Sequence, residues 1–185
     1  MEGLRTERLL LRRWLESDRP VFHRLNGDPD IMRFFPKPMT RSEADATMDR
    51  WNADLDADGM GFLAAVRLTD RRVIGVIGLS PVTEAIYDFA PTVQIGWRLL
   101  PEAQGSGLAT EGARACLAFG FGPLALPEIV AQCVTENTAS SAVMKRLGLR
   151  FRRSFDHPRI VARTHPHLLR HSLYGLRREE WQTPA

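Results

Sequence analysis

Gln104-Gly105-Ser106-Gly107-Leu108-Ala109 decides the predicted fold, because this stretch joins a strand-like run to a helix-like run. The strand-like run covers residues 92–99 and the helix-like run covers residues 108–121. The two glycines let the backbone approach a ligand closely, since no Cβ stands in the way. The helix behind them directs unpaired N–H groups and the positive end of its dipole toward the same place. The stretch is therefore predicted to bind an anion, and phosphate is the usual ligand of such a loop.

The spacing of the loop separates it from other glycine-rich motifs. A Walker loop needs Lys and then Ser or Thr after its last glycine, but Leu108 follows Gly107 here. A Rossmann fingerprint needs a third glycine or alanine where Thr110 stands. A nucleophile elbow needs one residue on each side of its serine, and Gly105-Ser106-Gly107 lacks these spacers. What remains, Gln-x-x-Gly-x-Ala, resembles the pyrophosphate-binding motif of the GNAT acetyltransferases, although an ordinary strand–helix turn is the alternative for this motif alone.

The composition is that of a soluble globular chain, with 44% hydrophobic and 25% charged residues. Its 185 residues suit a single domain, residues 1–185, with a full core. No apolar run approaches the length that spans a bilayer, and no apolar segment of a signal peptide is recognised. The two cysteines, Cys116 and Cys133, indicate neither a disulfide framework nor a zinc site. A cytoplasmic protein without membrane contact is expected.

Basic residues are concentrated near the C-terminus, although the whole chain has a net charge of only +3. Ten basic residues and one acid, Asp156, lie between Lys145 and Arg178, so this segment carries +9 and the rest carries −6. The segment could help to bind a polyanionic cofactor or an acidic partner, or could be a solvated face with local ion pairs. It contains no interleaved aromatic and basic residues and no recognition helix, so a nucleic-acid partner is not expected.

Four histidines also lie in this part of the chain. His157, His165, His167 and His171 match no known helical or hairpin spacing of metal ligands, and two prolines separate them. Unrelated histidines in a loop explain the pattern better than a metal site does, so no metal is expected.

The hydrophobic pattern predicts one α/β domain with a mostly antiparallel sheet. Strand-like runs lie at residues 4–14, 61–68, 73–79, 92–99, 129–134, 150–155 and 171–176. Helices are predicted at residues 19–25, about 40–56, 108–121 and about 138–147, and residues 159–167 are predicted to form a loop. Asn137 or Thr138 is expected to cap the last helix, with Gly148 just beyond its C-terminus.

Five regions resemble the RimJ/RimL-type branch of the GNAT family, in the order and spacing of that branch. They are residues 6–12, 95–97, 107–113, 137–140 with 147–149, and 173–181. The chain departs from the branch at residues 101–104, where an aromatic residue and a second glycine are common, and at Leu149, where Phe is commoner. The resemblance covers essentially the whole chain. It implies an α/β fold of the α+β type, with a mixed, mostly antiparallel six- to seven-stranded sheet and helices on both faces.

The resemblance implies that acetyl-CoA is the cosubstrate. Its pantetheine arm would lie along the strand that ends at Trp97, Arg98 and Leu99 and would bond to the main chain as a pseudo-strand. The amide of Asn137 would bond to the pantetheine or to a water, unless this residue only caps its helix. The diphosphate would bind the main-chain N–H groups of Gln104, Gly105, Ser106, Gly107, Leu108, Ala109 and Thr110.

The implied reaction transfers an acetyl group to a primary amine by direct attack, without an acyl-enzyme. It needs a neutral amine, a polarised carbonyl held close to it, and a proton for the departing thiolate. The hydroxyl of Ser140 is the first candidate to supply that proton, and a solvent-facing serine is the alternative. Tyr174 is a second candidate donor, or a packed residue of the last strand.

Three side chains are candidates for the base that takes the proton from the amine. Glu136 ends a strand, and Asp156 and His157 follow the next one. Histidine titrates near neutrality, which suits proton removal, although the neighbouring Asp156 could keep it charged. A surface position is the alternative for each of the three. An ordered water chain without a single base is a further possibility.

The acceptor pocket is expected to be walled by Trp14, Phe34 and Phe35, with Ile31, because the family places its first helices there. Core packing is the alternative, above all for Trp14. The acceptor is expected to be a small-molecule amine, an aminoglycoside-like amine or a protein N-terminus. The chain would act as a monomer or a homodimer. A non-catalytic acyl-CoA-binding or sensory module of the same fold is the alternative function.

Overall fold

The computed structural model describes residues 3–181, and within them the strands form one eight-stranded sheet. Its order is β1-β2-β3-β4-β5-β6-β8-β7, and every neighbouring pair except β5 and β6 is antiparallel. The strands are β1 (Leu4–Arg5), β2 (Leu9–Arg12), β3 (Phe62–Arg67), β4 (Val73–Val82), β5 (Thr92–Leu99), β6 (Glu128–Val134), β7 (Arg150–Asp156) and β8 (Arg170–Arg177). The predicted mixed, mostly antiparallel sheet is confirmed. It has one strand more than expected, because the first predicted strand is a hairpin of β1 and β2.

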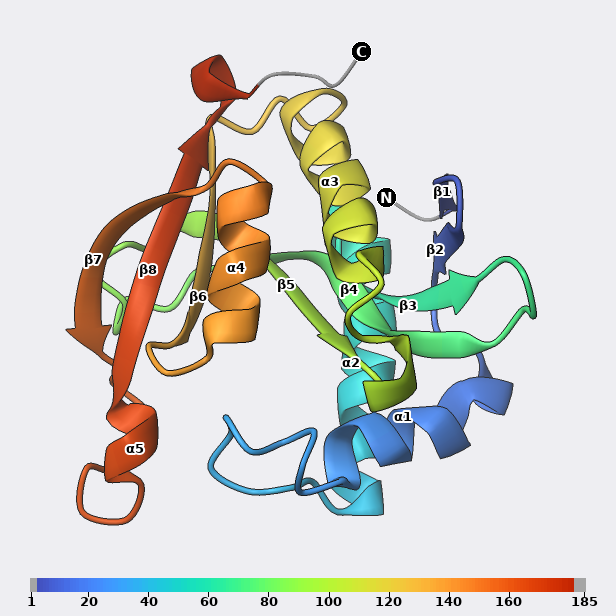
Figure 1. The fold of residues 1–185 in the computed structure, drawn as a ribbon, viewed down its shortest axis with the longest axis horizontal. Coiled ribbons are helices and arrows are strands. Elements are labelled where there is room, and N and C mark those ends of the chain that lie inside the picture. The colour runs from blue at the N-terminus through green and yellow to red at the C-terminus, as the bar shows by residue number, and fades with distance from the viewer. Residues whose placement is uncertain (1–2, 182–185) are drawn as a thin grey trace.

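Helices cover both faces of this sheet, as predicted. Figure 1 shows α3 and α4 in front of the strands and α2 behind them. The helices are α1 (Arg19–Gly27), α2 (Arg41–Asp58), α3 (Leu108–Phe121), α4 (Thr138–Arg146) and α5 (Pro166–Leu169), with 3-10 turns at η1 (Glu16–Asp18), η2 (Pro101–Ala103) and η3 (Arg178–Glu180). The predicted loop 159–167 is therefore slightly too long, because α5 already begins at Pro166. No helix in residues 3–181 is long and apolar enough to cross a membrane.

Two large hydrophobic cores hold these layers together, with a smaller third cluster around Val130, Phe155 and Leu173. Leu9 and Leu11 are fully buried in the larger core, which lies between the sheet and α3 and α4. Their burial follows from the period of two in β2, which turns alternate side chains to the same face. The second core lies between the sheet and α1 and α2, and Trp14 packs there edge-to-face on Phe22, with ring centroids 4.7 Å apart. Both faces of the sheet are therefore anchored independently.

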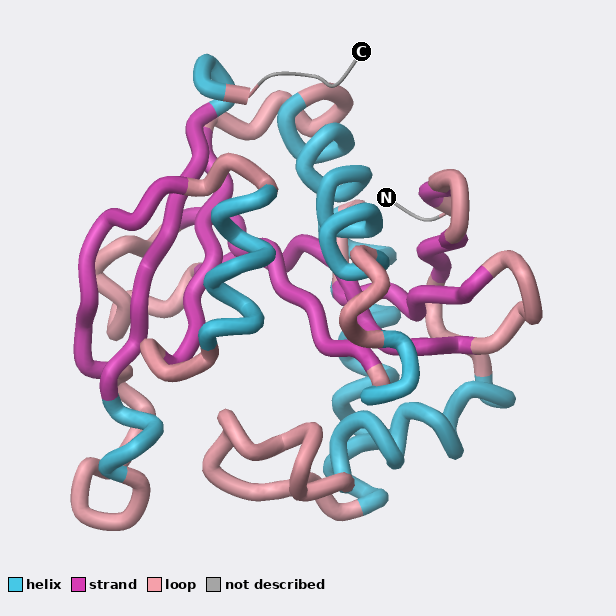
Figure 2. The backbone as a smooth tube through the Cα atoms, in the orientation of Figure 1, coloured by secondary structure: helices cyan, strands magenta, loops and turns pink. Residues whose placement is uncertain are grey.

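The central feature of the sheet is the separation of β5 from β6. Within residues 3–181 these two strands pair only at Val93–Ile129 and Gln94–Val130. Beyond Gln94, β5 continues to Leu99 beside β4 alone, while β6 continues beside β8. Figure 2 shows the two halves of the sheet diverging from this point. The facing edges of β5 and β6 therefore keep main-chain N–H and C=O groups available for a ligand, as strand edges do.

Candidate active site

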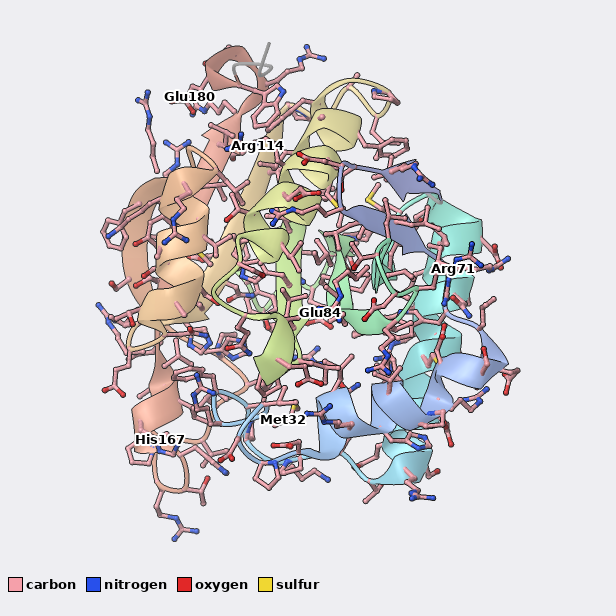
Figure 3. All side chains as sticks on the ribbon, turned by 45° about the vertical axis from the view of Figure 1, so that its right-hand side comes forward. Met32, Arg71, Glu84, Arg114, His167 and Glu180 are labelled. Atoms are coloured by element: carbon pink, nitrogen blue, oxygen red, sulfur yellow. The ribbon has the colours of Figure 1, made fainter. Side chains whose placement is uncertain are left out.

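A cavity of about 1460 Å³ opens where β5 and β6 separate. Residues on both faces of the sheet line it. One end, here called the cofactor side, is formed by residues 103–111, by Arg114, Ala115 and Ala118 of α3, and by α4. The other end, here called the acceptor side, is formed by Ile31, residues 33–36, Trp51, Phe62, Arg98, His157, Arg159 and Ile160. In Figure 3, Arg114 marks the α3 wall and Met32 marks the segment that carries the 31–36 wall.

The loop on the cofactor side has the conformation that its glycines allow. Gly105 and Gly107 have φ values of +76° and +82°, in the left-handed region that favours glycine. The side chain of Gln104 turns back to donate to the carbonyl of Leu99 at 2.9 Å, and the Ser106 hydroxyl donates to the carbonyl of Ala103 at 3.1 Å. Gly107 is the N-cap of α3 and offers no side chain to cap it, so the first N–H groups of α3 are free to bind an anion.

A cluster of polar contacts ties this loop to the N-terminal hairpin. The carboxylate of Glu111, in the first turn of α3, accepts from the Thr6 hydroxyl at 2.5 Å and from the Arg8 Nε at 2.6 Å. Arg8 also donates to the Ser106 carbonyl at 3.0 Å. Burial would raise the pKa of Glu111, but the hydrogen bonds from Thr6 and Arg8 outweigh it and hold the pKa below its usual value. The cluster fixes the start of α3 relative to the sheet.

The start of α4 faces the cavity from the other side of the opening. Asn137 is the N-cap, and its Oδ1 accepts from the Ser140 N–H at 3.1 Å. Asn137 and Ser140 both line the cavity. Capping uses only the amide oxygen, so the NH₂ group of Asn137 remains available to a ligand. Asn137 therefore caps its helix, as the alternative predicted, and this role does not prevent its NH₂ group from binding a ligand.

The strand residues predicted to contact the pantetheine lie on opposite faces of β5. Trp97, Arg98 and Leu99 all line the cavity. Trp97 and Leu99 belong to the core under α3, whereas Arg98 points to the α1/α2 side. Tyr174, the alternative proton donor, is 6% exposed, packs on Phe151 and is not among the cavity-lining residues. Tyr174 is therefore better described as a packed residue of β8 than as a proton donor.

The structure separates the three candidate bases. Glu136 is exposed and Asp156 forms an exposed ion pair with Arg170 at 3.1 Å, and neither lines the cavity. His157 does line it. Asp156 could have kept His157 charged, but its carboxylate pairs with Arg170 and the groups that shift the pKa of His157 are others. Burial, together with the charges of His171 and Arg159, lowers the pKa of His157 to about 4, so its imidazole is neutral at pH 7.

Both ring nitrogens of His157 already have partners. Its Nδ1 lies 3.3 Å from the main-chain nitrogen of Arg159 and accepts its N–H, so the proton is on Nε2, which faces the Tyr87 hydroxyl at 3.1 Å. His171 is different. Its Nδ1 lies 3.3 Å from the Leu169 carbonyl, which can only accept, so its Nε2 is an unprotonated acceptor. His171 lines the cavity, and burial lowers its pKa, so its imidazole is neutral at pH 7 and it is a further candidate base, which the sequence did not single out.

Aromatic residues lie at the end of the cavity that holds residues 31–36, although not all of those expected at an acceptor pocket are among them. Phe34 and Phe35 line the cavity, and the Arg98 guanidinium lies 5.0 Å from the Phe35 ring centroid. Trp51 and Phe62 are further wall residues, which sequence reasoning did not single out. Trp14 is 2% exposed and is not among the lining residues, so it is a core residue, which was the alternative to a place in the pocket wall.

The site therefore combines a strand, a glycine loop and a helix N-terminus beside two strands that separate. The family model described as the acetyltransferase (GNAT) domain matches residues 8–150. The chain belongs to the GNAT acetyltransferase family. The matched residues include the whole loop, β5, β6 and α4, so the family assignment covers the cofactor side of the cavity.

Two curated proteins in this family illustrate the relationship. The chain is 30% identical over 146 residues to the uncharacterized N-acetyltransferase YnaD of Bacillus subtilis, covering 78% of this chain and 81% of that protein. It is 32% identical over 151 residues to the FsC-acetyl coenzyme A-N(2)-transacetylase of Aspergillus fumigatus. That alignment covers 79% of this chain and 64% of the fungal protein, so this chain spans less than two thirds of that relative.

Solved GNAT structures share the fold over nearly the whole chain. A GNAT-family acetyltransferase from Bacillus anthracis has a TM-score of 0.78 at 24% identity, covering 96% of this chain and 99% of that one. The ribosomal L7/L12 α-N-protein acetyltransferase RimL, solved in complex with coenzyme A, has a TM-score of 0.74 at 18% identity and covers 93% and 95%. At these identities the comparisons establish the fold.

The neutral histidines give this GNAT chain a predicted pH dependence of stability. Between the usual histidine pKa of 6.5 and about 4, unfolded His157 binds a proton that the folded chain does not bind. Protonation therefore favours the unfolded state, and stability is expected to fall as pH decreases through this window. His171 adds to the effect in the same direction. Urea midpoints at pH 7 and pH 5 will measure it.

The matched variant for this prediction is His157→Gln, which keeps a donor for Tyr87 and removes the titrating group. Its urea midpoint should change less between pH 7 and pH 5 than that of the wild type. The carboxylates of Glu43 and Asp70, whose pKa hydrogen bonds lower to about 2, are present in both proteins, so their contribution cancels in the comparison. Equal losses in both proteins would show that His157 is not responsible.

Proposed function

We propose that the protein transfers an acetyl group from acetyl-CoA to a primary amine by direct attack, and that it belongs to the RimJ/RimL-type branch. The observation that carries this proposal is the single cavity that runs from the free N–H groups of α3, through the gap between β5 and β6, to the aromatic acceptor side. A diphosphate bound at one end and an amine bound at the other would meet within the gap. The acceptor is a small-molecule amine or a protein N-terminus.

The cofactor side would hold acetyl-CoA through main-chain groups. The N–H groups of residues 104–110 would bind the diphosphate, helped by the dipole of α3. The free edge of β5 beyond Gln94 would bond to the pantetheine amides in the manner of an added strand, and the NH₂ group of Asn137 would reach it from α4. Arg114 and Arg146 line the same side and would add positive charge near the phosphates.

The chemical step has a balanced route through the cavity-lining residues. The neutral amine nitrogen attacks the thioester carbon, which forms a C–N bond and moves an electron pair to the carbonyl oxygen. His171 Nε2, directly or through a water, takes the proton that the nitrogen loses. The C–S bond then breaks as the carbonyl re-forms, and the thiolate takes a proton from the Ser140 hydroxyl, which solvent reprotonates. Placing the reactants together supplies much of the rate.

Two measurements test this proposal. Calorimetry should show binding of both coenzyme A and acetyl-CoA, and mixing the protein with acetyl-CoA and a panel of primary amines should release free thiol. The control is the protein with acetyl-CoA and no amine, which should release thiol no faster than acetyl-CoA in buffer alone. Binding without turnover on any amine would favour the non-catalytic acyl-CoA-binding module instead. Absence of binding to either form of coenzyme A would remove the proposed function altogether.

A further inference from the structure

Arg98 is a partly buried cation on the acceptor side of the cavity, and no acid pairs with it among the described residues. Its Nη2 donates to the Asn26 Oδ1 at 2.5 Å, while its Nε is buried without a hydrogen-bond partner. Asn26 itself is fully buried and donates to the Phe22 carbonyl at 2.8 Å, so the Arg98 side chain is held in place by a rigid neighbour. The guanidinium carbon lies 5.0 Å from the Phe35 ring centroid, so a cation–π contact adds to this hold.

A charge that is partly removed from water and has no counter-ion costs stability, so a residue like Arg98 needs an explanation. Burial lowers the pKa of Arg98 to about 10, and the side chain therefore stays charged at neutral pH. A guanidinium has five N–H groups, and only one of these donates to a described residue. The planar group is matched to a carboxylate, which it can bind through two parallel hydrogen bonds.

The other charges around the cavity point to the same kind of ligand. Arg33 and Arg159 also line the acceptor side. Among the described lining residues the one acid is Glu111, and Arg8 and Thr6 already hold its carboxylate at the cofactor loop. Glu84 pairs with Arg159, so Arg98 and Arg33 are the cations that a polycationic acceptor, such as an aminoglycoside-like amine, would meet here without a paired acid among the described residues. An acceptor with an anionic group would be attracted.

A second buried group indicates where the amine would lie. Gln132 on β6 donates to the Gln94 Oε1 at 3.5 Å, but its own Oε1 is buried without a partner. Both glutamines line the cavity at the point where β5 and β6 separate. An amine N–H is the kind of donor that the Gln132 oxygen lacks. Gln94, Gly96 and Arg98 lie on one face of β5, and the Phe62 ring packs on Gly96 between the other two, so close that a Cβ there would meet it at 2.9 Å.

We infer that the acceptor is an amine that also carries a carboxylate, with the carboxylate bound by Arg98 and the amine placed beside Gln132 and His171. This inference rests on the proposed function and narrows its substrate class to amino acids or amino-acid-like acids. It excludes polyamines and aminoglycosides as preferred acceptors, which the sequence alone left open.

The test compares amines in matched pairs that differ only by the carboxylate. Phenylalanine and 2-phenylethylamine form one pair, and 4-aminobutyrate and propylamine form a second pair with a longer spacing. Thiol release is measured per unit of neutral amine, because the two members of a pair differ in amine pKa. In at least one pair, kcat/KM is expected to be about 10- to 100-fold higher for the acid, as a charge-assisted hydrogen-bond pair provides. Equal rates in both pairs, with turnover present, would overturn the inference and leave the proposed function standing.

Variants of the site sharpen the result. Arg98→Met should remove the preference for the acid while the Kd for acetyl-CoA stays the same, and Arg98→Lys should keep part of it. Asn26→Asp places a carboxylate beside Arg98, so it should reduce the preference in a chain that retains the arginine. Equal loss of both members of a pair in all three folded variants would overturn the inference. A phosphate-bearing amine, 2-aminoethyl phosphate, used better than every carboxylate would also overturn it.

Discussion

Replacing Gly107 by valine is expected to weaken acetyl-CoA binding by about 10- to 100-fold, because the loop can no longer keep its conformation. Gly107 has φ +82°, and a β-branched residue at such a value costs about 1–3 kcal/mol of backbone strain. A Cβ at this position would meet only the end of the Arg8 side chain, at 3.6 Å, so steric exclusion in the empty loop is small. The strain is instead relieved by turning the N–H groups at the start of α3 away from the diphosphate. Calorimetric titration with acetyl-CoA measures the effect.

Gly148→Val is the matched control for this change. Gly148 has nearly the same φ, +85°, and also stands at a helix end in open space, but it does not line the cavity. It should lower the melting temperature about as much as Gly107→Val and leave the Kd for acetyl-CoA unchanged. If the two variants weaken acetyl-CoA binding equally, the loss reflects general destabilisation. If neither weakens it, the loop does not bind the diphosphate.

Local signals in the sequence were sufficient for much of this fold. The range predicted for the helix after the glycine loop matches α3, Leu108–Phe121, because Gly107 and Gly122 stop the helical pattern on both sides. The left-handed Gly148 follows α4 as predicted, since glycine tolerates that conformation after a helix C-terminus. The strand 92–99 matches β5 for a similar reason, because apolar alternation and Pro101 define its limits. Helix capping and the spacing of hydrophobic residues depend on residues that are close together along the chain, so a single sequence is enough to predict them.

The acceptor side could not be predicted to the same degree, because distant residues form it. His171 seemed one of four unrelated histidines, yet β8 places it next to His157, with ring centroids 4.6 Å apart. Arg98 seemed a pantetheine-strand residue, and only the packing of α1 brings Asn26 to it. Alternation in β8 was the one available signal, since it puts His171 on the same face as Leu173. Alternation predicts the face of the sheet on which His171 lies, but it does not predict which strand lies beside β8.

Replacing Ser140 by alanine is expected to lower kcat by about 10- to 100-fold and to change the Kd for acetyl-CoA little. A free thiol has a pKa of about 8.5, so its protonated form is the stable one at pH 7. The departing thiolate therefore benefits from a proton or a strong hydrogen bond as the C–S bond breaks. Ser140 lines the cavity, and its N–H is already fixed by Asn137, which holds the start of α4 without using the hydroxyl. Single-turnover rates and calorimetric titrations separate the chemical step from binding.

The neighbouring serine provides the control for this experiment. Ser141 donates its hydroxyl to the Thr138 carbonyl at 3.0 Å and is not among the cavity-lining residues, so Ser141→Ala should keep the wild-type kcat. Ser140→Thr retains a hydroxyl and should recover part of the rate that alanine loses, which a purely structural role for the side chain would not predict. Wild-type kcat in Ser140→Ala would mean that water protonates the thiolate. In that case the geometry of the gap between β5 and β6, rather than an acid on α4, would account for the rate.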